Sequence, residues 1–355
     1  MSDTPVELTI LEALPEGLLD CPPTDLHRVL PGPTLIHLPG EREPPLFVSV
    51  LMHGNEPVGW DAVRLSLRDG LERHGRFGLP RALSLFIGNV AAAAHGQRRL
   101  PGQPDYNRVW PGSELPATPE HALMASVVEA MRARGLFASI DLHNNTGANP
   151  HYACVNVIDN RFLHLATLFS RTVVYFLRPR GVQSQAMAAL GPAVTLECGK
   201  AGEAYGVAQA REFINACLHL SELPEYPVPA QDIDLFHTVA QMRVPADIRF
   251  GFPPAQPTLI LSPELERLNF RELPAGTAFA RVRAEAGAAV PALLDVRDER
   301  GRDVANRFFV LEDGELRLKV SAMPSMLTAD LTVIRQDCLG YLMERYDQCL
   351  PRRGD

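Results

Sequence analysis

The stretch LFVSVLMHGNEPVGWDAV, residues 46–63, passes from an apolar run into a histidine, a glutamate and then a helical pattern. The run predicts a buried strand, and Pro57 suits the first turn of the helix that follows. A strand that ends in His53 and Glu56 needs a chemical reason, because ionisable groups are costly to bury without a partner. Gly54 is expected to give the backbone the freedom to turn between the two side chains.

The same alternation continues to about residue 220. Apolar runs rich in β-branched and aromatic residues are separated by longer segments of helical period; these runs are LSLFIGN, LFASIDLH, YACVNVI, TVVYFL and AVTLEC. Continuous apolar strands between helices predict an α/β domain whose sheet is covered on both faces. Ligands of such sheets bind beyond the strand ends, so polar residues at those ends are the first candidates for function.

The pattern changes at ELPEYPVPAQDIDL, residues 222–235, where three prolines interrupt the helical period and predict a linker. Short strand-like runs follow, with turn signals such as Asp313-Gly314. We therefore predict a catalytic domain over residues 1–228. Residues 229–355 are predicted to form a smaller β-rich domain with a terminal helix, in which Tyr341 and Tyr346 pack.

Composition excludes several classes of protein. The 355 residues are 46% hydrophobic and 21% charged, which is typical of a globular chain and not of a disordered one. A net charge of −8 without a basic cluster argues against a nucleic-acid partner. No apolar run is long enough to span a bilayer and the N-terminus lacks a basic region, so we expect a soluble cytoplasmic protein without a membrane partner. Six cysteines without a CxxC pair indicate free thiols; they are Cys21, Cys154, Cys198, Cys217, Cys338 and Cys349.

Ionisable groups end three of the predicted strands. His53 and Glu56 follow the first, His143 lies in DLHNN, and Glu197 ends AVTLEC. Two histidines and one carboxylate, with a fourth position left to water, form a ligand set of catalytic zinc. Asp141 lies on the same face of its strand as His143 and is a candidate acceptor for the second ring nitrogen, although a backbone carbonyl would serve as well.

Glu197 is the candidate for proton transfer. Hydrolysis of an amide needs a base for the proton of water and an acid for the departing amine, and burial at a strand end would raise the pKa of this carboxyl. The alternative is a structural carboxylate paired with Lys200. Cys198 is expected to point away from the site and to pack. A lone HxxE is common by chance, and it is the conjunction of four groups at strand ends that favours a site.

Four ordered motifs resemble the succinylglutamate desuccinylase and aspartoacylase family, zinc amidohydrolases related to the zinc carboxypeptidases. They are HGNE (53–56), DYNRVWPG (105–112), DLHNNTG (141–147) and TLECGK (195–200). The resemblance covers about residues 46–220 and implies a carboxypeptidase-like mixed sheet flanked by helices. It also implies one Zn²⁺ ion per subunit held by His53, Glu56 and His143, with Glu197 as general base and then acid.

The resemblance places Asn107 and Arg108 where the family binds a substrate carboxylate, and a guanidinium suits that role because it binds carboxylates in a bidentate manner. An arginine upstream polarises the scissile carbonyl in the family; counting back nine residues from Arg108 favours Arg99, with Arg98 as the alternative. The family's further arginine before the catalytic glutamate has no clear counterpart here. The substrate is therefore expected to lack a second carboxylate.

The resulting hypothesis is a zinc-dependent hydrolase of linear amides that deacylates an N-acyl amino acid or a related small amide. A metallocarboxypeptidase that acts on peptides and a non-catalytic metal-binding relative are the alternatives. Two histidines and a carboxylate also suit iron, manganese or cobalt. His151, soon after the third motif, is a further candidate for the pocket wall. The oligomeric state is open, and a homo-oligomer is compatible with the sequence.

Overall fold

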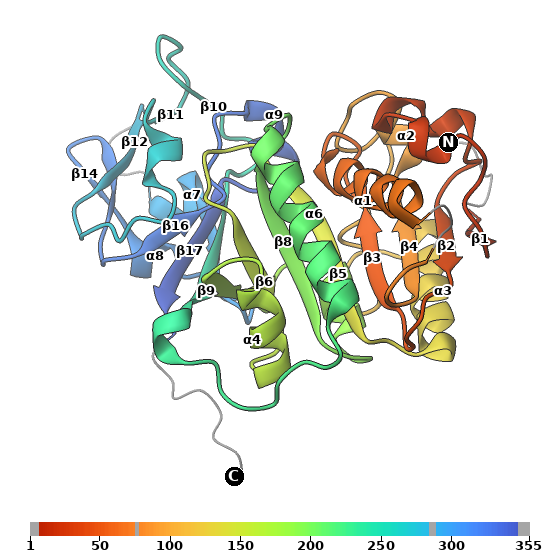
Figure 1. Ribbon diagram of the computed structural model, residues 1–355. Coiled ribbons are helices and arrows are strands. Elements are labelled where there is room, and N and C mark those ends of the chain that lie inside the picture. The colour runs from red at the N-terminus through yellow and green to blue at the C-terminus, as the bar shows by residue number, and fades with distance from the viewer. Residues whose placement is uncertain (1–6, 75–77, 284–288, 347–355) are drawn as a thin grey trace.

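A computed structural model (Figure 1) describes residues 7–74, 78–283 and 289–346. Its main sheet has the strand order β1-β2-β4-β3-β5-β8-β6-β7-β9-β17-β16, with β13 paired to β9. These strands are, in chain order, β1 (Thr9–Leu11), β2 (Thr34–Leu38), β3 (Leu46–Val50), β4 (Leu83–Ile87), β5 (Ala138–Asn145), β6 (Tyr152–Val155), β7 (Thr172–Tyr175), β8 (Ala193–Lys200), β9 (Asp234–Arg243), β13 (Asp295–Arg297), β16 (Met323–Ser325) and β17 (Gly340–Arg345).

The middle of this sheet is parallel, and β3, β4, β5 and β8 are buried except for Lys200 at the end of β8. β3 pairs in parallel with β4 and β5, and β5 pairs in parallel with β8, whereas β2 and β6 run antiparallel to their neighbours β4 and β8. Because parallel strands end at one edge of a sheet, the segments that follow β3, β5 and β8 meet there. The predicted mixed sheet is confirmed.

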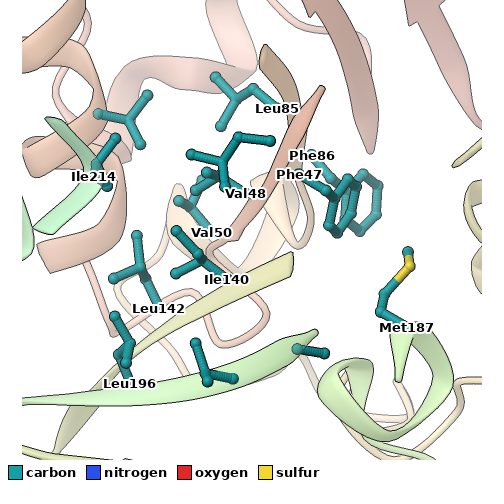
Figure 2. Close-up of a cluster of buried hydrophobic side chains, with 14 of the residues drawn as sticks. Phe47, Val48, Val50, Leu85, Phe86, Ile140, Leu142, Met187, Leu196 and Ile214 are labelled. Carbon is teal, nitrogen blue, oxygen red and sulfur yellow. The ribbon is translucent and has the colours of Figure 1, made fainter. Parts of the chain in front are cut away.

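Helices cover both faces of the sheet, as the alternation of side chains along a strand requires. Phe47 lies on the side of Met187 from α5, and Val48 lies on the side of Ile214 from α6 (Figure 2). The longer helices are α1 (Val58–His74), α3 (Pro119–Arg134), α4 (Asn160–Thr167) and α6 (Ala204–His219). The shorter ones are α2 (Val90–Ala93), α5 (Gln183–Met187), α7 (Val290–Leu293), α8 (Ala305–Phe308) and α9 (Leu331–Gln336), with 3₁₀ turns η1 (Leu18–Asp20), η2 (Pro23–Arg28), η3 (Ala230–Asp232) and η4 (Leu265–Leu268).

A second, smaller sheet follows the proline-rich segment, as predicted. Its order is β10-β11-β12-β15-β14, and the strands are β10 (Phe250–Gly251), β11 (Leu259–Leu261), β12 (Ala278–Val282), β14 (Phe309–Glu312) and β15 (Glu315–Leu318). The Asp313-Gly314 turn joins β14 to β15, with positive φ angles of 49° and 74°. The C-terminal region also contributes β9, β17, β16 and β13 to the main sheet, so one sheet runs across residue 228.

The predicted terminal helix is wrong where the structure describes it. Tyr341 lies in β17, which pairs along six residues with β9, and Tyr346 follows directly after that strand. Residues 347–355, including Cys349, lie outside the described residues; Cys21, Cys154, Cys198, Cys217 and Cys338 are free thiols. None of the helices in the described ranges is long and apolar enough to cross a membrane.

Candidate active site

The edge of the sheet brings His53, Glu56 and His143 together. The first two lie in the turn between β3 and α1, and His143 lies near the end of β5. One ligand atom from each side chain falls within 4.8 Å of the others, and all three side chains are buried. Within the described ranges this is the one group of histidine, cysteine, aspartate and glutamate side chains close enough to hold a metal ion.

Both histidines turn the same ring nitrogen toward Glu56. His53 Nδ1 lies 2.8 Å from Glu56 Oε1, and His143 Nδ1 lies 2.7 Å from Glu56 Oε2. The opposite nitrogens face carboxylates, with His53 Nε2 at 2.9 Å from Asp105 Oδ1 and His143 Nε2 at 2.7 Å from Asp141 Oδ2. A carboxylate accepts a hydrogen bond from Nε2–H, so in the neutral ring Nδ1 carries the lone pair. Two lone pairs and a carboxylate that converge in this way fit a divalent cation with nitrogen and oxygen ligands.

The two glutamates of the site differ in their surroundings. Burial alone would raise the pKa of Glu56, but the charges and hydrogen bonds of His53 and His143 lower it below its ordinary value. Burial raises the pKa of Glu197 to about 7, while the charge of His143 opposes the shift. Glu197 in β8 stands opposite His143 in β5, and its Oε2 atom is buried with no hydrogen-bond partner among the described residues. Lys200 pairs with Glu266 instead, which removes the structural alternative for Glu197.

A cavity that opens to solvent contains these groups together with Asn107, Arg98 and Arg108. The Asn107 amide donates to Asp141 Oδ2 at 3.1 Å, and its Oδ1 accepts from the backbone of Gln183 at 2.9 Å. This side chain therefore positions the carboxylate behind His143.

Of the two arginines proposed to face the scissile carbonyl, the structure places Arg98 in the cavity. Its guanidinium lies 3.5 Å from Glu56 Oε1 and donates to Asp105 Oδ2 at 2.8 Å. Arg99 lines a different hollow and donates to the backbone of Gln103 at 3.0 Å. The preference for Arg99 is therefore not supported. The Arg98 carbonyl also accepts a hydrogen bond from Gly54 N at 3.2 Å, and this bond holds Arg98 against the turn that carries His53 and Glu56.

Several residues in or beside the cavity are not marked as functional by the sequence patterns. Asp105 stands in the DYNRVWPG motif, two residues before Asn107, and its acidic side chain in that motif was an available signal. Asp337 and Cys338 come from the C-terminal region, where no motif marks them, and the sequence predicts a helix, not a strand, at Tyr341. These three line the cavity beside Tyr152 from β6.

Two other predictions concern side chains near β8. His151 is not among the lining residues of the cavity; it contacts Gln209 and stacks on Phe169. Cys198 is fully buried and also absent from the lining, as the strand alternation predicted.

The comparisons with known proteins agree with this geometry. Residues 43–221, just over half of the chain, match the family described as succinylglutamate desuccinylase/aspartoacylase catalytic domain. No curated protein sequence gives a significant match. Succinylglutamate desuccinylase from Chromobacterium violaceum is 18% identical with a TM-score of 0.55, over 85% of this chain and 84% of that one. Murine aminoacylase 3 is 15% identical with a TM-score of 0.52, over 86% of this chain and 97% of that one.

At such identities the solved structures show a shared fold, and the family match carries the assignment. The match spans all four motifs, from the turn with His53 to the strand with Glu197. Family and fold together indicate an acylase-type enzyme that hydrolyses amide bonds. The chain belongs to the succinylglutamate desuccinylase/aspartoacylase family.

Proposed function

We propose that the protein is a zinc-dependent amidohydrolase that removes the acyl group from an N-acyl amino acid or a related small amide. The observation that carries the proposal is the buried carboxyl of Glu197, whose Oε2 atom has no hydrogen-bond partner among the described residues, in the same cavity as the His53, Glu56 and His143 trio. A buried ionisable group without a partner is costly, and a proton-transfer role explains its presence.

The trio would hold the cation, with Asp105 and Asp141 behind the two histidines. When bound, zinc lowers the pKa of water toward neutrality and polarises an amide carbonyl. The carboxylates behind the rings fix which nitrogen is protonated and how each imidazole is turned. The chain therefore presents a pre-oriented ligand set rather than three independent side chains.

Glu197 would act as the proton carrier. Its ionised carboxylate takes a proton from the attacking water, and the carboxylic acid so formed returns that proton to the departing amine. A pKa near neutrality suits both halves of this cycle, because the group must accept and release a proton at similar pH. Burial supplies that pKa.

Arg98 would stabilise negative charge on the carbonyl oxygen. Its guanidinium lies beside Glu56 and remains protonated at any pH at which the protein is folded. A fixed donor in a site screened from water stabilises an oxyanion more strongly than water does. Arg98 takes this role in preference to Arg99 because Arg98 alone of the two lines the cavity.

Apolar side chains also line the cavity. They include Val174, Phe176, Val182 and Met326. An apolar lining with a few polar groups is typical of small-molecule sites. It supports a substrate with an apolar acyl group or an apolar side chain.

Replacement of Glu197 tests the proposal. In zinc-loaded Glu197→Gln, amine release from N-acyl amino acids and N-acyl amines should fall at least ~100-fold, since the proton carrier is lost. Bound metal, measured by elemental analysis, should not change because Glu197 is not a ligand. Glu222→Gln, at an exposed position, is the matched control. Full activity in Glu197→Gln would contradict the proposal. Peptide substrates are assayed in parallel, because a metallocarboxypeptidase would hydrolyse these in preference to N-acyl amino acids and N-acyl amines.

A further inference from the structure

Asp337 places a carboxylate against two arginines inside the cavity. Arg108 Nη2 donates to both of its oxygens, at 3.0 and 3.2 Å, and Arg98 Nη2 donates to Oδ2 at 3.2 Å. The second terminal nitrogen of Arg108 donates to the backbone of Asn107 at 2.8 Å. The Arg108 guanidinium, which would otherwise be available to a substrate carboxylate, therefore already donates to Asp337 and Asn107.

The positive charges at this end of the cavity are balanced. Arg98 and Arg108 face Asp105 and Asp337, two cations against two carboxylates, and all four side chains are mostly buried. Both carboxyls have pKa values below their ordinary range: burial opposes the shift, and neighbouring positive groups, among them Arg98 and Arg108, outweigh it. The charges of Arg98 and Arg108 are thus already compensated within the protein.

A third arginine lines the cavity and is also paired. Arg178 Nη1 donates to Glu114 at 2.7 Å, and Arg178 Nε donates to the backbone of Glu299 at 2.7 Å. Within the described lining, no arginine is left without an anionic partner.

Asp337 is fixed by the backbone on both sides. Asp337 follows the last residue of α9, and its N–H donates to the Val333 carbonyl within that helix. Two residues later, Leu339 N donates to the Met242 carbonyl of β9 at 2.8 Å. Ile334 and Leu339 are buried in the core of the C-terminal region. These contacts hold the backbone around Asp337 in the fold, with its carboxylate in the cavity wall.

We propose that Asp337 is a built-in counterion that determines specificity: it excludes substrates with a carboxylate at the Arg108 end and selects amides that are uncharged there. The inference rests on the proposed function and narrows its substrates to the small amides without that carboxylate, such as N-acyl amines. An incoming carboxylate would either lie beside Asp337 or separate it from its arginines, and both outcomes are unfavourable for buried charges. A neutral group meets no such penalty.

Binding of matched compounds tests this directly. N-acetyl derivatives of alanine, leucine and phenylalanine are each compared with the N-acetyl amine that lacks the carboxylate, by calorimetry on zinc-loaded Glu197→Gln and by amine release from the zinc-loaded wild type. We expect at least about tenfold tighter binding and at least about tenfold higher kcat/KM for the uncharged member. Equal binding, no binding of any pair, or tighter binding of the carboxylates would overturn the inference.

Asp337→Asn supplies the second arm. With its counterion removed, Arg108 should bind carboxylates, and the ratio of kcat/KM values should move at least about tenfold toward the N-acyl amino acid. Glu344→Gln is the matched control, because it removes one negative charge from β17 at an exposed pair with Arg307; its ratio should equal that of the wild type. An unchanged ratio of kcat/KM values in a folded Asp337→Asn variant would overturn the inference. If that variant does not fold, the comparison of matched compounds described above decides.

The two proposals fail in different ways. If no amine is released from any compound but the uncharged members still bind more tightly, the hydrolase proposal fails and the role of Asp337 stands. If the N-acyl amino acids are hydrolysed faster than their uncharged partners, the hydrolase proposal stands and the role of Asp337 fails.

Discussion

At the scale of single residues, the pKa of Glu197 sets an expectation for the rate. Burial raises this pKa from 4.5 to about 7, and the base must be ionised to accept a proton. kcat/KM should therefore fall as the pH is lowered through that pKa. A bound cation favours the ionised form, so we expect the midpoint of the acidic limb between 4.5 and about 7. A pH profile of kcat/KM checks this, and a rate that stays constant across that interval would contradict it.

Asp141 gives a second prediction. Its carboxylate accepts from His143 at 2.7 Å and also from the Ser49 hydroxyl at 2.7 Å, so it fixes the ring of one proposed ligand. Asp141→Asn should weaken zinc binding by about 10- to 100-fold, as is typical when a carboxylate behind a ligand histidine is lost. Competition with a chelator measures the affinity, with the exposed Asp232→Asn as control. Wild-type affinity in Asp141→Asn would show that the backbone, not this carboxylate, orients His143.

Residue patterns predicted part of this site. His53, Glu56, His143 and Glu197 could be named because each ends an apolar strand, and the sheet then brings strand ends together. Asp337 could not be named, since it lies 229 residues beyond Arg108 in the chain and acquires its role only through contact. The choice between Arg98 and Arg99 likewise depends on a backbone hydrogen bond to Gly54 that residue spacing does not reveal.

At the scale of elements, the turn after β3 depends on close backbone packing. A Cβ atom on Gly54 would lie 2.2 Å from Ala93 N and 2.3 Å from the Ala92 carbonyl carbon, both backbone atoms of α2. Gly54 is needed because the two backbones approach closely, not because its φ is positive. The residue with a left-handed conformation here is Leu51, with φ 56°. The sequence pattern predicted the glycine's importance but assigned it the wrong physical cause.

Gly54→Ala should therefore destabilise the fold by roughly 1–3 kcal/mol, because the turn must move away from α2. Zinc content should fall with it, since His53 and Glu56 flank the displaced residue. Gly70→Ala in α1 is the control: a Cβ there meets open space, and alanine favours a helix by about 1 kcal/mol. Urea unfolding and elemental analysis measure both effects, and wild-type stability with full zinc in Gly54→Ala would contradict the packing argument.

The element that sequence patterns misassigned is β17. Its buried residues are Gly340, Leu342 and Met343, and the adjacent pair at 342 and 343 breaks the alternation of a half-buried strand. Pairing with β9 on one side and β16 on the other decides the structure. Strand formation there depends on partners that are distant in sequence, which local patterns do not encode.

At the scale of the whole molecule, β9 continues the main sheet beyond the predicted boundary at residue 228. It pairs in parallel with β7 and carries β17 and β16 at its other side. The α/β class could be predicted from the apolar strands of the first 220 residues, whereas this continuation could not, because it rests on strand pairing across the proline-rich segment. The division into residues 1–228 and 229–355 stays a prediction about chain organisation.

A fragment of residues 1–228 should fail to behave as an independent domain. Without β9, strand β7 would present unpaired backbone groups at a sheet edge, a known template for aggregation. We expect the fragment to be insoluble or oligomeric in size-exclusion chromatography, and to lack a cooperative thermal transition, with the full chain as control. A monomeric fragment with cooperative unfolding would show that the first part folds without the second.

The origin of the cavity walls has a consequence for how this enzyme could diversify. The groups that perform the chemistry come from residues 53–197, whereas Ser325, Met326, Asp337 and Tyr341 come from a later stretch of the chain. Duplicated genes could accumulate substitutions in that later stretch and acquire new substrates while they inherit the same reaction. The same separation offers a practical route to laboratory evolution: a library confined to residues 325–341 would vary selectivity and leave the metal-binding turn untouched.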